Sequence, residues 1–438
     1  MVGEWGTASL RELCDFRAGS VFKPVLQGRS SGEFPFVKVS DMNLPENVVR
    51  IHDANNWVSA ADLRELRAKP FPPGTVVFAK IGEALRQNRL RQVVRETVID
   101  NNMMGAVPRI NRVDPRFFYY ALSRFNFSDI AQGTALPYLT VGSLSALTLD
   151  VPPPVEQLAI AHILGTLDDK IECNRRINET LEAMTRTLFK SWFVDFNPVT
   201  AKMEGRWQRG QTLPGLPAHL YDLFPDRLVE SELGEIPEGW EVTSLSKFSS
   251  LNPESWTKRT RPGEIRYVDL SNTKWGRVES VTNYEADDAP SRAQRVLRPL
   301  DTIVGTVRPG NGSYALISDE GLTGSTGFAV LRPLRRECSE FVYLAATACE
   351  NIERLSNLAD GGAYPAVRPE IVSATQVPRV GQELINEFSR QVSPMLAGIA
   401  DNERTSRPLT QLRDALLPKL ISGELRVPDA ERIVGAAV

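Results

Sequence analysis

The longest helical pattern in the chain lies at residues 151–197 and reads VPPPVEQLAIAHILGTLDDKIECNRRINETLEAMTRTLFKSWFVDFN. Prolines at 152–154 end the preceding segment, and from Val155 to Asn197 there is no proline and only one glycine, Gly165. Apolar residues recur there at alternating steps of four and three, the heptad spacing of a helix that packs along another helix. A helix of this length extends roughly 60 Å. The pattern therefore predicts a long helix with a helical partner.

A second stretch repeats this apolar seam 228 positions later. The predicted seam positions are Ile160, Leu164, Leu167, Ile171, Asn174, Leu181 and Leu188 in the first helix, and Phe388, Val392, Met395, Ile399, Asn402, Leu409 and Leu416 in the second. Each seam has a polar residue at its centre, Asn174 or Asn402, and a buried polar layer can fix the register of a coiled coil. Two related seams predict that the helices pack against each other, antiparallel. Pro394, Pro408 and Pro418 predict that the second helix is bent or interrupted.

The segments before the two helices are also related. GTALPYL at residues 133–139 corresponds to GGAYPAV at 361–367, and FVKVSD at 36–41 corresponds to YVDLSN at 267–272. Short β-branched runs bounded by glycine and proline indicate strands and turns in both segments. The predicted fold class is α+β, with two similar mixed α/β domains. They are separated by two long helices that form an antiparallel coiled coil, and the whole is an internal pseudo-two-fold repeat.

The internal repeat and the positions of proline- and glycine-rich stretches give the expected domain boundaries. We expect a first mixed domain at residues 1–152, its helix at 153–197, a proline- and glycine-rich linker at 198–235, a second mixed domain at 236–379, the second helix at 380–424, and a short, loose tail at 425–438.

Composition excludes several classes of protein. The 438 residues carry a formal net charge of −3, so a wholly basic nucleic-acid protein is excluded, although local basic patches are not. Three histidines and four scattered cysteines argue against a metal centre or a disulfide scaffold. No run of about 18 apolar residues and no signal-peptide pattern occurs, so we expect a cytoplasmic protein with no membrane partner. No phosphate-binding loop, dinucleotide fingerprint or hydrolase motif is present, so no catalytic residues are assigned.

Basic residues gather in one segment of each half. Residues 80–95 carry five basic side chains against one acidic, and residues 256–277 carry six against two. Arg, Gln and Asn can pair with base edges in the major groove, while other Arg and Lys side chains hold phosphates. The candidate DNA contacts in the first half are Lys80, Arg86, Gln87, Asn88, Arg89, Arg91, Thr134 and Tyr138. Those in the second half are Lys258, Arg259, Arg261, Lys274, Arg308, Asn311, Ser313 and Tyr364. The alternative is that these segments are solvated faces and tight turns.

Four stretches of the chain, two of them within the first long helix pattern, carry a resemblance to a known family. They are VPPPVEQLAI at 151–160, LFKSWFVDF at 188–196, LGEIPEGW at 233–240 and LRDALLPKLISGEL at 412–425. With them the chain resembles, over essentially its whole length, the specificity subunits of type I restriction–modification systems. The resemblance implies two target recognition domains, each reading one half of a bipartite, asymmetric site in double-stranded DNA, with the antiparallel helices setting the spacing.

The resemblance also implies what accompanies the chain. It implies a non-catalytic subunit that binds no cofactor and recruits two methylation subunits, which use S-adenosylmethionine to modify adenine. Restriction subunits join in the full complex. Two alternatives stay open: a DNA methyltransferase or nuclease in its own right, which the absent motifs disfavour, and a coiled-coil scaffold without nucleic acid. Salt-sensitive binding to duplex DNA would exclude the scaffold.

Overall fold

The computed structural model describes residues 5–133, 135–231, 234–257, 259–362 and 365–435. The chain forms two compact units, one of Met1–Arg176 with Asn402–Val438 and the other of Ile177–Asp401. Among the described residues, no helix is both long and apolar enough to cross a membrane.

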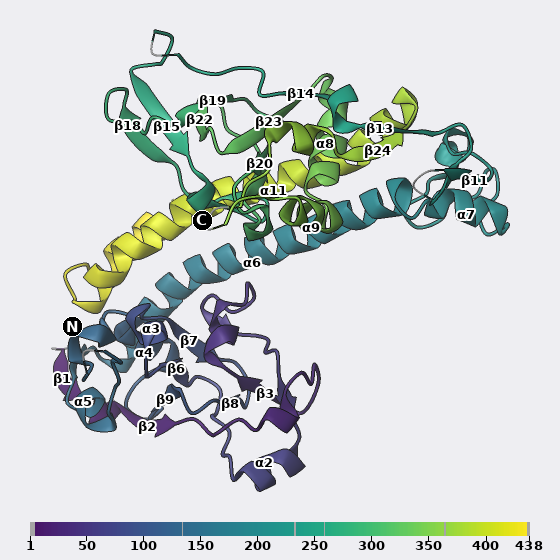
Figure 1. Ribbon diagram of the computed structural model, residues 1–438. Helices are drawn as coiled ribbons and strands as arrows, with labels where there is room; N and C mark the ends of the chain where they lie inside the picture. Colours follow the sequence, from purple (N-terminus) through teal and green to yellow (C-terminus); the bar gives the residue numbers. More distant parts are fainter. Residues whose placement is uncertain (1–4, 134, 232–233, 258, 363–364, 436–438) are drawn as a thin grey trace. The chain divides into compact units, whose positions relative to one another are not determined.

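The first unit is built on two sheets and a strand pair (Figure 1). The five-stranded sheet has the order β2 (Cys14–Ala18), β9 (Met103–Pro108), β6 (Val76–Ala79), β7 (Leu90–Val93) and β4 (Arg50–Ile51). The three-stranded sheet has the order β5 (Trp57–Val58), β3 (Phe34–Val37) and β8 (Val98–Ile99). The antiparallel pair is β1 (Gly6–Ser9) with β10 (Thr148–Val151).

The second unit contains corresponding sheets. One four-stranded sheet has the order β14 (Ser249–Leu251), β23 (Phe328–Pro333), β20 (Thr302–Gly305) and β21 (Tyr314–Leu316). The other has the order β18 (Thr282–Glu285), β15 (Glu264–Val268), β22 (Leu322–Ser325) and β19 (Ala293–Leu297). The strand pairs are β11 (Leu228–Ser231) with β12 (Gly234–Pro237), β13 (Glu241–Ser244) with β24 (Gln376–Arg379), and β16 (Thr273–Lys274) with β17 (Arg277–Val278).

The strand pairings confirm that the two mixed domains are related. The order β2-β9-β6-β7 in the first unit recurs as β14-β23-β20-β21 in the second, with every pair antiparallel. The parallel pair β3 and β8 recurs as β15 and β22. A helix follows the second strand of each series: α4 (Pro115–Leu122) after β9, and α8 (Ser339–Ala346) after β23. The fold class is therefore the predicted one, a duplicated α+β domain.

The two long helices are α6 (Pro154–Phe193) and α11 (Gln382–Ile421), each of 40 residues. In the first unit, Asn174 of α6 donates a hydrogen bond to the Ser406 hydroxyl of α11 at 3.1 Å. In the second unit, Asn178 donates to the carbonyl oxygen of Ile399 at 3.3 Å, and the rings of Trp192 and Phe388 are 5.6 Å apart. The first unit also pairs Arg413 of α11 with Asp168 of α6. Within each unit the partner numbers fall in α11 as they rise in α6, so the helix segments pack antiparallel.

All of the predicted seam positions are buried or half-buried in the structure. Fully buried seam positions are Ile160, Leu164, Leu167, Asn174, Phe388, Val392, Leu409 and Leu416, and half-buried ones are Ile171, Leu181, Leu188, Met395, Ile399 and Asn402. Each helix segment also closes a domain core. In the first unit Leu164 and Leu167 pack with Phe117 and Phe118 of α4, so the seam joins the domain and the helix pair in one apolar cluster.

The expectation of an interrupted second helix is wrong, because α11 is a single helix from Gln382 to Ile421. Its three prolines, Pro394, Pro408 and Pro418, are all exposed. A proline in a helix leaves the carbonyl four residues earlier without its amide donor. The residues four positions earlier, Arg390, Arg404 and Asp414, are exposed as well, so water can reach this side of the helix.

The predicted tail and the predicted linker both contain folded elements. The tail forms α12 (Val427–Gly435), whose Ala430 and Val434 are buried, because apolar residues four apart share one face of a helix. The proline- and glycine-rich segment begins with α7 (Asn197–Met203) and buries Trp207 and Phe224. The Phe224 ring meets Trp192 edge to face at 5.2 Å. This segment is therefore part of the core of the second unit.

Candidate nucleic-acid interface

In each unit, the loop that follows strand β6 or β20 lies beside a turn that comes more than 50 residues later in the chain. In the first unit the Leu139 amide donates to the Lys80 carbonyl at 2.9 Å, and the Gly82 amide donates to the Pro137 carbonyl at 2.8 Å. In the second unit the Val367 amide donates to Thr306 at 2.9 Å, and the Arg308 amide to Pro365 at 2.8 Å. The same two backbone bonds thus occur at corresponding positions. We call this arrangement the paired-loop site. It comprises residues 80–89, 132–133 and 135–139 in the first unit and residues 306–313, 360–362 and 365–367 in the second.

In the first unit the paired-loop site presents polar and basic side chains to solvent. Arg86, Gln87, Arg89 and Tyr138 are exposed, and Lys80 is half-buried. The short helix α3 (Glu83–Arg86) carries part of this set, and Arg86 lies 3.2 Å from the Glu83 carboxylate. An exposed ion pair of this kind is weak and can be exchanged for a phosphate.

Two other candidates in the first unit are engaged by the protein itself. Asn88, at a positive φ of 49°, donates to the Phe125 carbonyl at 2.8 Å and accepts from the Phe127 amide at 3.0 Å. The Arg91 guanidinium donates to the carbonyls of Asn47, Leu90 and Met42. Burial lowers the pKa of Arg91. Both side chains fix neighbouring loops in this conformation.

The candidates in the second unit divide in the same way. Arg259, Lys274, Arg308 and Asn311 are exposed. Arg261 donates to the carbonyls of Ala286, Pro290 and Ala293, and the buried Ser313 donates to the Leu270 carbonyl at 3.0 Å. Three candidates, Thr134, Lys258 and Tyr364, lie outside the described residues.

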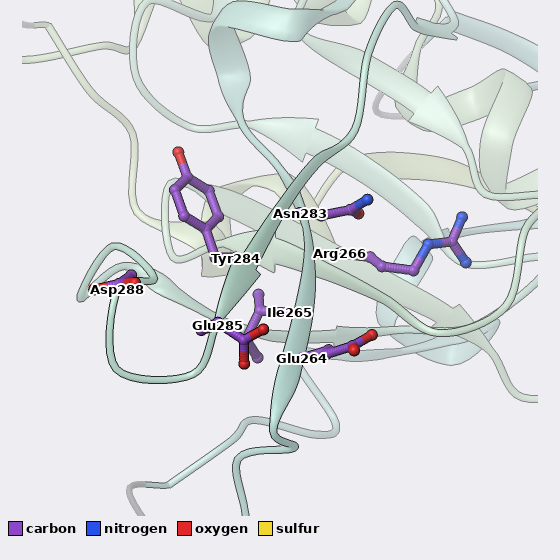
Figure 2. Close-up of a pocket in the computed structure, with 7 residues that line it drawn as sticks. All are labelled: Glu264, Ile265, Arg266, Asn283, Tyr284, Glu285 and Asp288. Atoms are coloured by element: carbon purple, nitrogen blue, oxygen red, sulfur yellow. The ribbon is translucent and has the colours of Figure 1, made fainter.

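A pocket of about 520 Å³ opens on the neighbouring strands β15 and β18 (Figure 2). It is lined by Glu264, Ile265, Arg266, Asn283, Tyr284, Glu285 and Asp288. Three carboxylates against one guanidinium repel phosphate, so we exclude this pocket from the candidate DNA surface. Among the described residues, no group of three or more His, Cys, Asp or Glu side chains is placed so that it could hold a metal ion.

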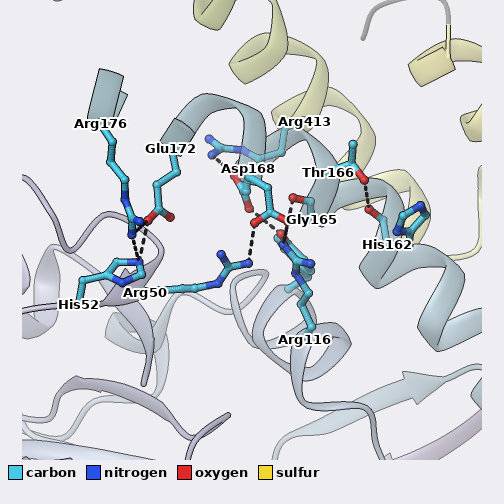
Figure 3. Close-up of polar contacts among 12 residues, drawn as sticks. Arg50, His52, Arg116, His162, Gly165, Thr166, Asp168, Glu172, Arg176 and Arg413 are labelled. Carbon is cyan, nitrogen blue, oxygen red and sulfur yellow. Dashed lines mark hydrogen bonds and ion pairs between the residues drawn. The ribbon is translucent and has the colours of Figure 1, made fainter. Parts of the chain in front are cut away.

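A polar network fastens the first mixed domain to α6 (Figure 3). Asp169 accepts hydrogen bonds from Arg50 and Arg116, each at 2.7 Å, and Arg116 also donates to the Gly165 carbonyl at 3.0 Å. A Cβ at residue 165 would lie 2.2 Å from the guanidinium carbon of Arg116, which explains the single glycine in this helix. Burial opposes ionisation of Asp169, but the two arginines outweigh it and hold its pKa below the ordinary 3.8.

The adjacent Asp168 is almost completely buried and joins three elements. It accepts from the Tyr120 hydroxyl of α4 at 2.6 Å and from the Arg413 guanidinium of α11 at 2.7 Å. Burial raises the pKa of Tyr120, and the negative charge of Asp168 raises it further. Tyr120 therefore stays protonated and serves as a donor. In the second unit α6 is also hydrogen-bonded to the mixed domain, because Arg186 of α6 donates to the Thr347 carbonyl at 3.1 Å.

Comparison with known proteins supports the resemblance seen in the sequence motifs. A family model described as the type I restriction modification DNA specificity domain matches residues 3–183. The type I restriction enzyme HindI specificity subunit of Haemophilus influenzae is 27% identical over 416 residues, which cover 83% of this chain and 89% of that one. The MjaIX specificity subunit of Methanocaldococcus jannaschii is 22% identical over 97% of this chain and 94% of its own length. Over most of its length the chain is similar to the specificity subunits of type I restriction–modification systems.

A solved structure shares the fold of this chain. The crystal structure of the type I restriction–modification S subunit from M. genitalium matches with a TM-score of 0.59 and 16% identity, covering 96% of each chain. These relatives give no support to the alternative of a methyltransferase or nuclease acting on its own, or to that of a scaffold without nucleic acid.

The network around Asp168 and the exposed Trp275 were not predicted from the sequence. The network around Asp168 and Asp169 was missed because its partners come from segments far apart in sequence, such as Arg50 and Arg413. Trp275, the exposed residue at the turn between β16 and β17, was missed because the candidates were chosen by charge and hydrogen-bonding capacity. The sequence signal for Trp275 was an aromatic residue placed between basic residues and next to a glycine, in Lys274-Trp275-Gly276-Arg277.

Proposed function

We propose that this specificity subunit recognises double-stranded DNA by sequence and that each unit reads one half of a split, asymmetric site. The observation that carries the proposal is the duplicated paired-loop site, which has the same two backbone hydrogen bonds in each unit and exposed Arg, Asn or Gln side chains in both. The similarity to type I specificity subunits supports the same reading.

The exposed candidates have the chemistry that this task needs. Arginine pairs with guanine, and Asn and Gln pair with adenine, through two hydrogen bonds in the major groove, while Lys and other Arg side chains hold phosphates. The proposed contacts are Lys80, Arg86, Gln87, Arg89 and Tyr138 in the first unit and Arg259, Lys274, Arg308 and Asn311 in the second. Asn88, Arg91, Arg261 and Ser313 are proposed to support these loops, because their polar groups already bind the protein.

We propose that α6 and α11 set the gap between the two half-sites. A helix of 40 residues is roughly 60 Å long, and successive major-groove segments on one side of B-DNA recur about every 34–36 Å. A helix pair of this length is sufficient to separate two readers by one helical turn of DNA.

The proposed partners follow from the family. Two methylation subunits would bind this subunit and use S-adenosylmethionine to modify adenine, and restriction subunits would join them in a cytoplasmic complex. The subunit itself would hold no cofactor and do no chemistry.

Binding of the complex with its methylation subunits to duplex DNA tests the proposal. We expect tight binding to a duplex with both half-sites, much weaker binding to a scrambled duplex, and a steep loss of affinity as salt rises. Equal affinity for both duplexes at every salt concentration would refute sequence recognition. Retained recognition after either half-site is scrambled would refute the split site.

A further inference from the structure

Trp275 is the one exposed residue among the seven tryptophans, all of which lie in the described part of the chain. Its relative exposure is 55%, whereas Trp192 and Trp207 are at most 1% exposed and the other four are half-buried. An exposed indole presents a large apolar surface to water, which is unfavourable unless a partner covers it. Its position therefore requires an explanation beyond packing.

The backbone holds Trp275 rigidly. Its φ of 48° is in the left-handed region, which is costly for a residue with a Cβ. The Trp275 amide donates to the Gly312 carbonyl at 2.7 Å, and the Gly276 amide donates to the Tyr314 carbonyl at 2.9 Å. These bonds tie the β16–β17 turn to the loop that carries Arg308 and Asn311.

The indole itself is partly fixed as well. A Cβ at Gly312 would lie 2.6 Å from the ring, so the glycine leaves the space in which the indole rests. Tyr314 meets the ring edge to face at 6.0 Å. The remaining surface of the ring is exposed, so Trp275 is an aromatic side chain that is ordered before any partner arrives. A preorganised aromatic group loses little conformational entropy on binding.

The charge around Trp275 favours nucleic acid as that partner. Lys274 is exposed beside it, and the loop under its ring carries the exposed Arg308 and Asn311. One acidic residue of the hairpin, Glu279, is exposed two positions after Arg277. Basic side chains around an apolar contact suit a groove between phosphates, whereas the centre of a protein interface is depleted in charge.

We propose that Trp275 contacts DNA in the half-site read by the second unit, with its indole against base edges and deoxyribose in the groove. The proposal rests on the proposed function and adds an apolar determinant to the polar contacts. An apolar side chain recognises thymine through its methyl group, which a hydrogen-bonding contact does not. Trp275 is therefore a specificity-determining residue, and Lys274 beside it holds a phosphate.

The test uses the full complex with its methylation subunits and duplexes that differ from the target at one base pair at a time. Replacing Trp275 by alanine should weaken binding to the target about tenfold and relax the preference at one or two positions of a single half-site. Trp275→Phe should restore much of the preference. The other half-site should be read as before.

Matched variants separate this role from others. Lys274→Ala should weaken binding to every duplex by the same factor. Trp240→Phe changes a half-buried tryptophan whose ring packs against Phe193 and Phe196, and it should leave the sequence preference unchanged. Thermal unfolding of each variant checks that the fold is intact.

Three outcomes would overturn the proposal. They are an unaltered preference in Trp275→Ala, an equal loss for all duplexes in that variant, and failure of that variant to bind the methylation subunits, which would place the indole in a protein interface. If the wild-type complex shows no sequence preference at all, the proposed function itself fails. If wild type shows the preference and Trp275→Ala keeps it, only this inference fails.

Discussion

At the scale of single residues, Asp168 and Asp414 bind the same guanidinium from very different surroundings. The side chain of Asp168 is 4% exposed and that of Asp414 is 60% exposed, and each lies 2.7 Å from Arg413. Removing one partner of a buried pair leaves uncompensated polar groups, whereas an exposed pair contributes little.

Asp168→Ala should therefore lower the free energy of unfolding by about 3 kcal/mol or more, because Tyr120 and Arg413 both lose a buried acceptor. Asp414→Ala should cost less than about 1 kcal/mol. Urea denaturation of both variants measures the difference. Similar losses in the two variants would contradict the special role of the buried carboxylate.

The ion pairs of Asp169 predict how the free energy of unfolding depends on pH. The folded state holds the pKa of this carboxylate below 3.8, so the unfolded chain takes up the proton first as pH falls. The stabilisation is complete above the unfolded pKa and is lost as pH decreases through the folded pKa. Since the side chain is 47% exposed, the effect is modest.

Denaturation of wild type and Asp169→Asn between about pH 6 and pH 3 measures this contribution. Wild type should be the more stable protein at the upper end, and the difference should shrink toward the lower end. If the stability difference between wild type and Asp169→Asn grew as the pH fell, its sign would be opposite to the prediction. The ion pairs of Asp169 would then not stabilise the folded state.

Residue-level prediction from sequence was only partly possible. The basic runs mark where positive charge lies along the chain, but Arg91 binds carbonyls near residue 45 and Arg261 binds carbonyls near residue 290. Whether an arginine faces solvent or its own backbone depends on such distant segments. Charge along the chain therefore could not separate Arg86 and Arg89 from Arg91.

At the scale of elements, α11 is one helix in spite of its prolines. Pro408 lies inside α11 with its side chain exposed, so its ring costs the helix a hydrogen bond without supporting a core. Pro408→Ala should raise the free energy of unfolding by about 1–3 kcal/mol, since it restores an amide donor and helix propensity. Denaturant unfolding of the variant tests this. A loss of stability would mean that the proline has a packing role.

The long helices were predictable because each has a seam that persists over many turns. The helical tail and the folded segment after α6 were not. Their apolar residues, such as Ala430 and Trp207, lie in short runs interrupted by glycine and proline, so that only tertiary contacts reveal their burial. The duplicated strand pairs were visible as weak repeats, but their pairing order was not.

At the scale of the whole molecule, the duplication is the central feature. The two units repeat a strand order, a paired-loop site and a stretch of each long helix. The recurrence of related motifs about 228 positions apart in the sequence predicts this duplication. A duplicated reader binds two similar DNA segments, and because the side chains of the two loops differ, we expect the two half-sites to differ in sequence.

Mapping methylated adenines across the genome of cells that express this chain with its methylation subunits tests this account most directly. We expect one motif with two unlike half-sites separated by a gap of fixed length, and in Asn311→Ala a change confined to one half. A continuous motif, or a change in both halves from that one substitution, would contradict the account.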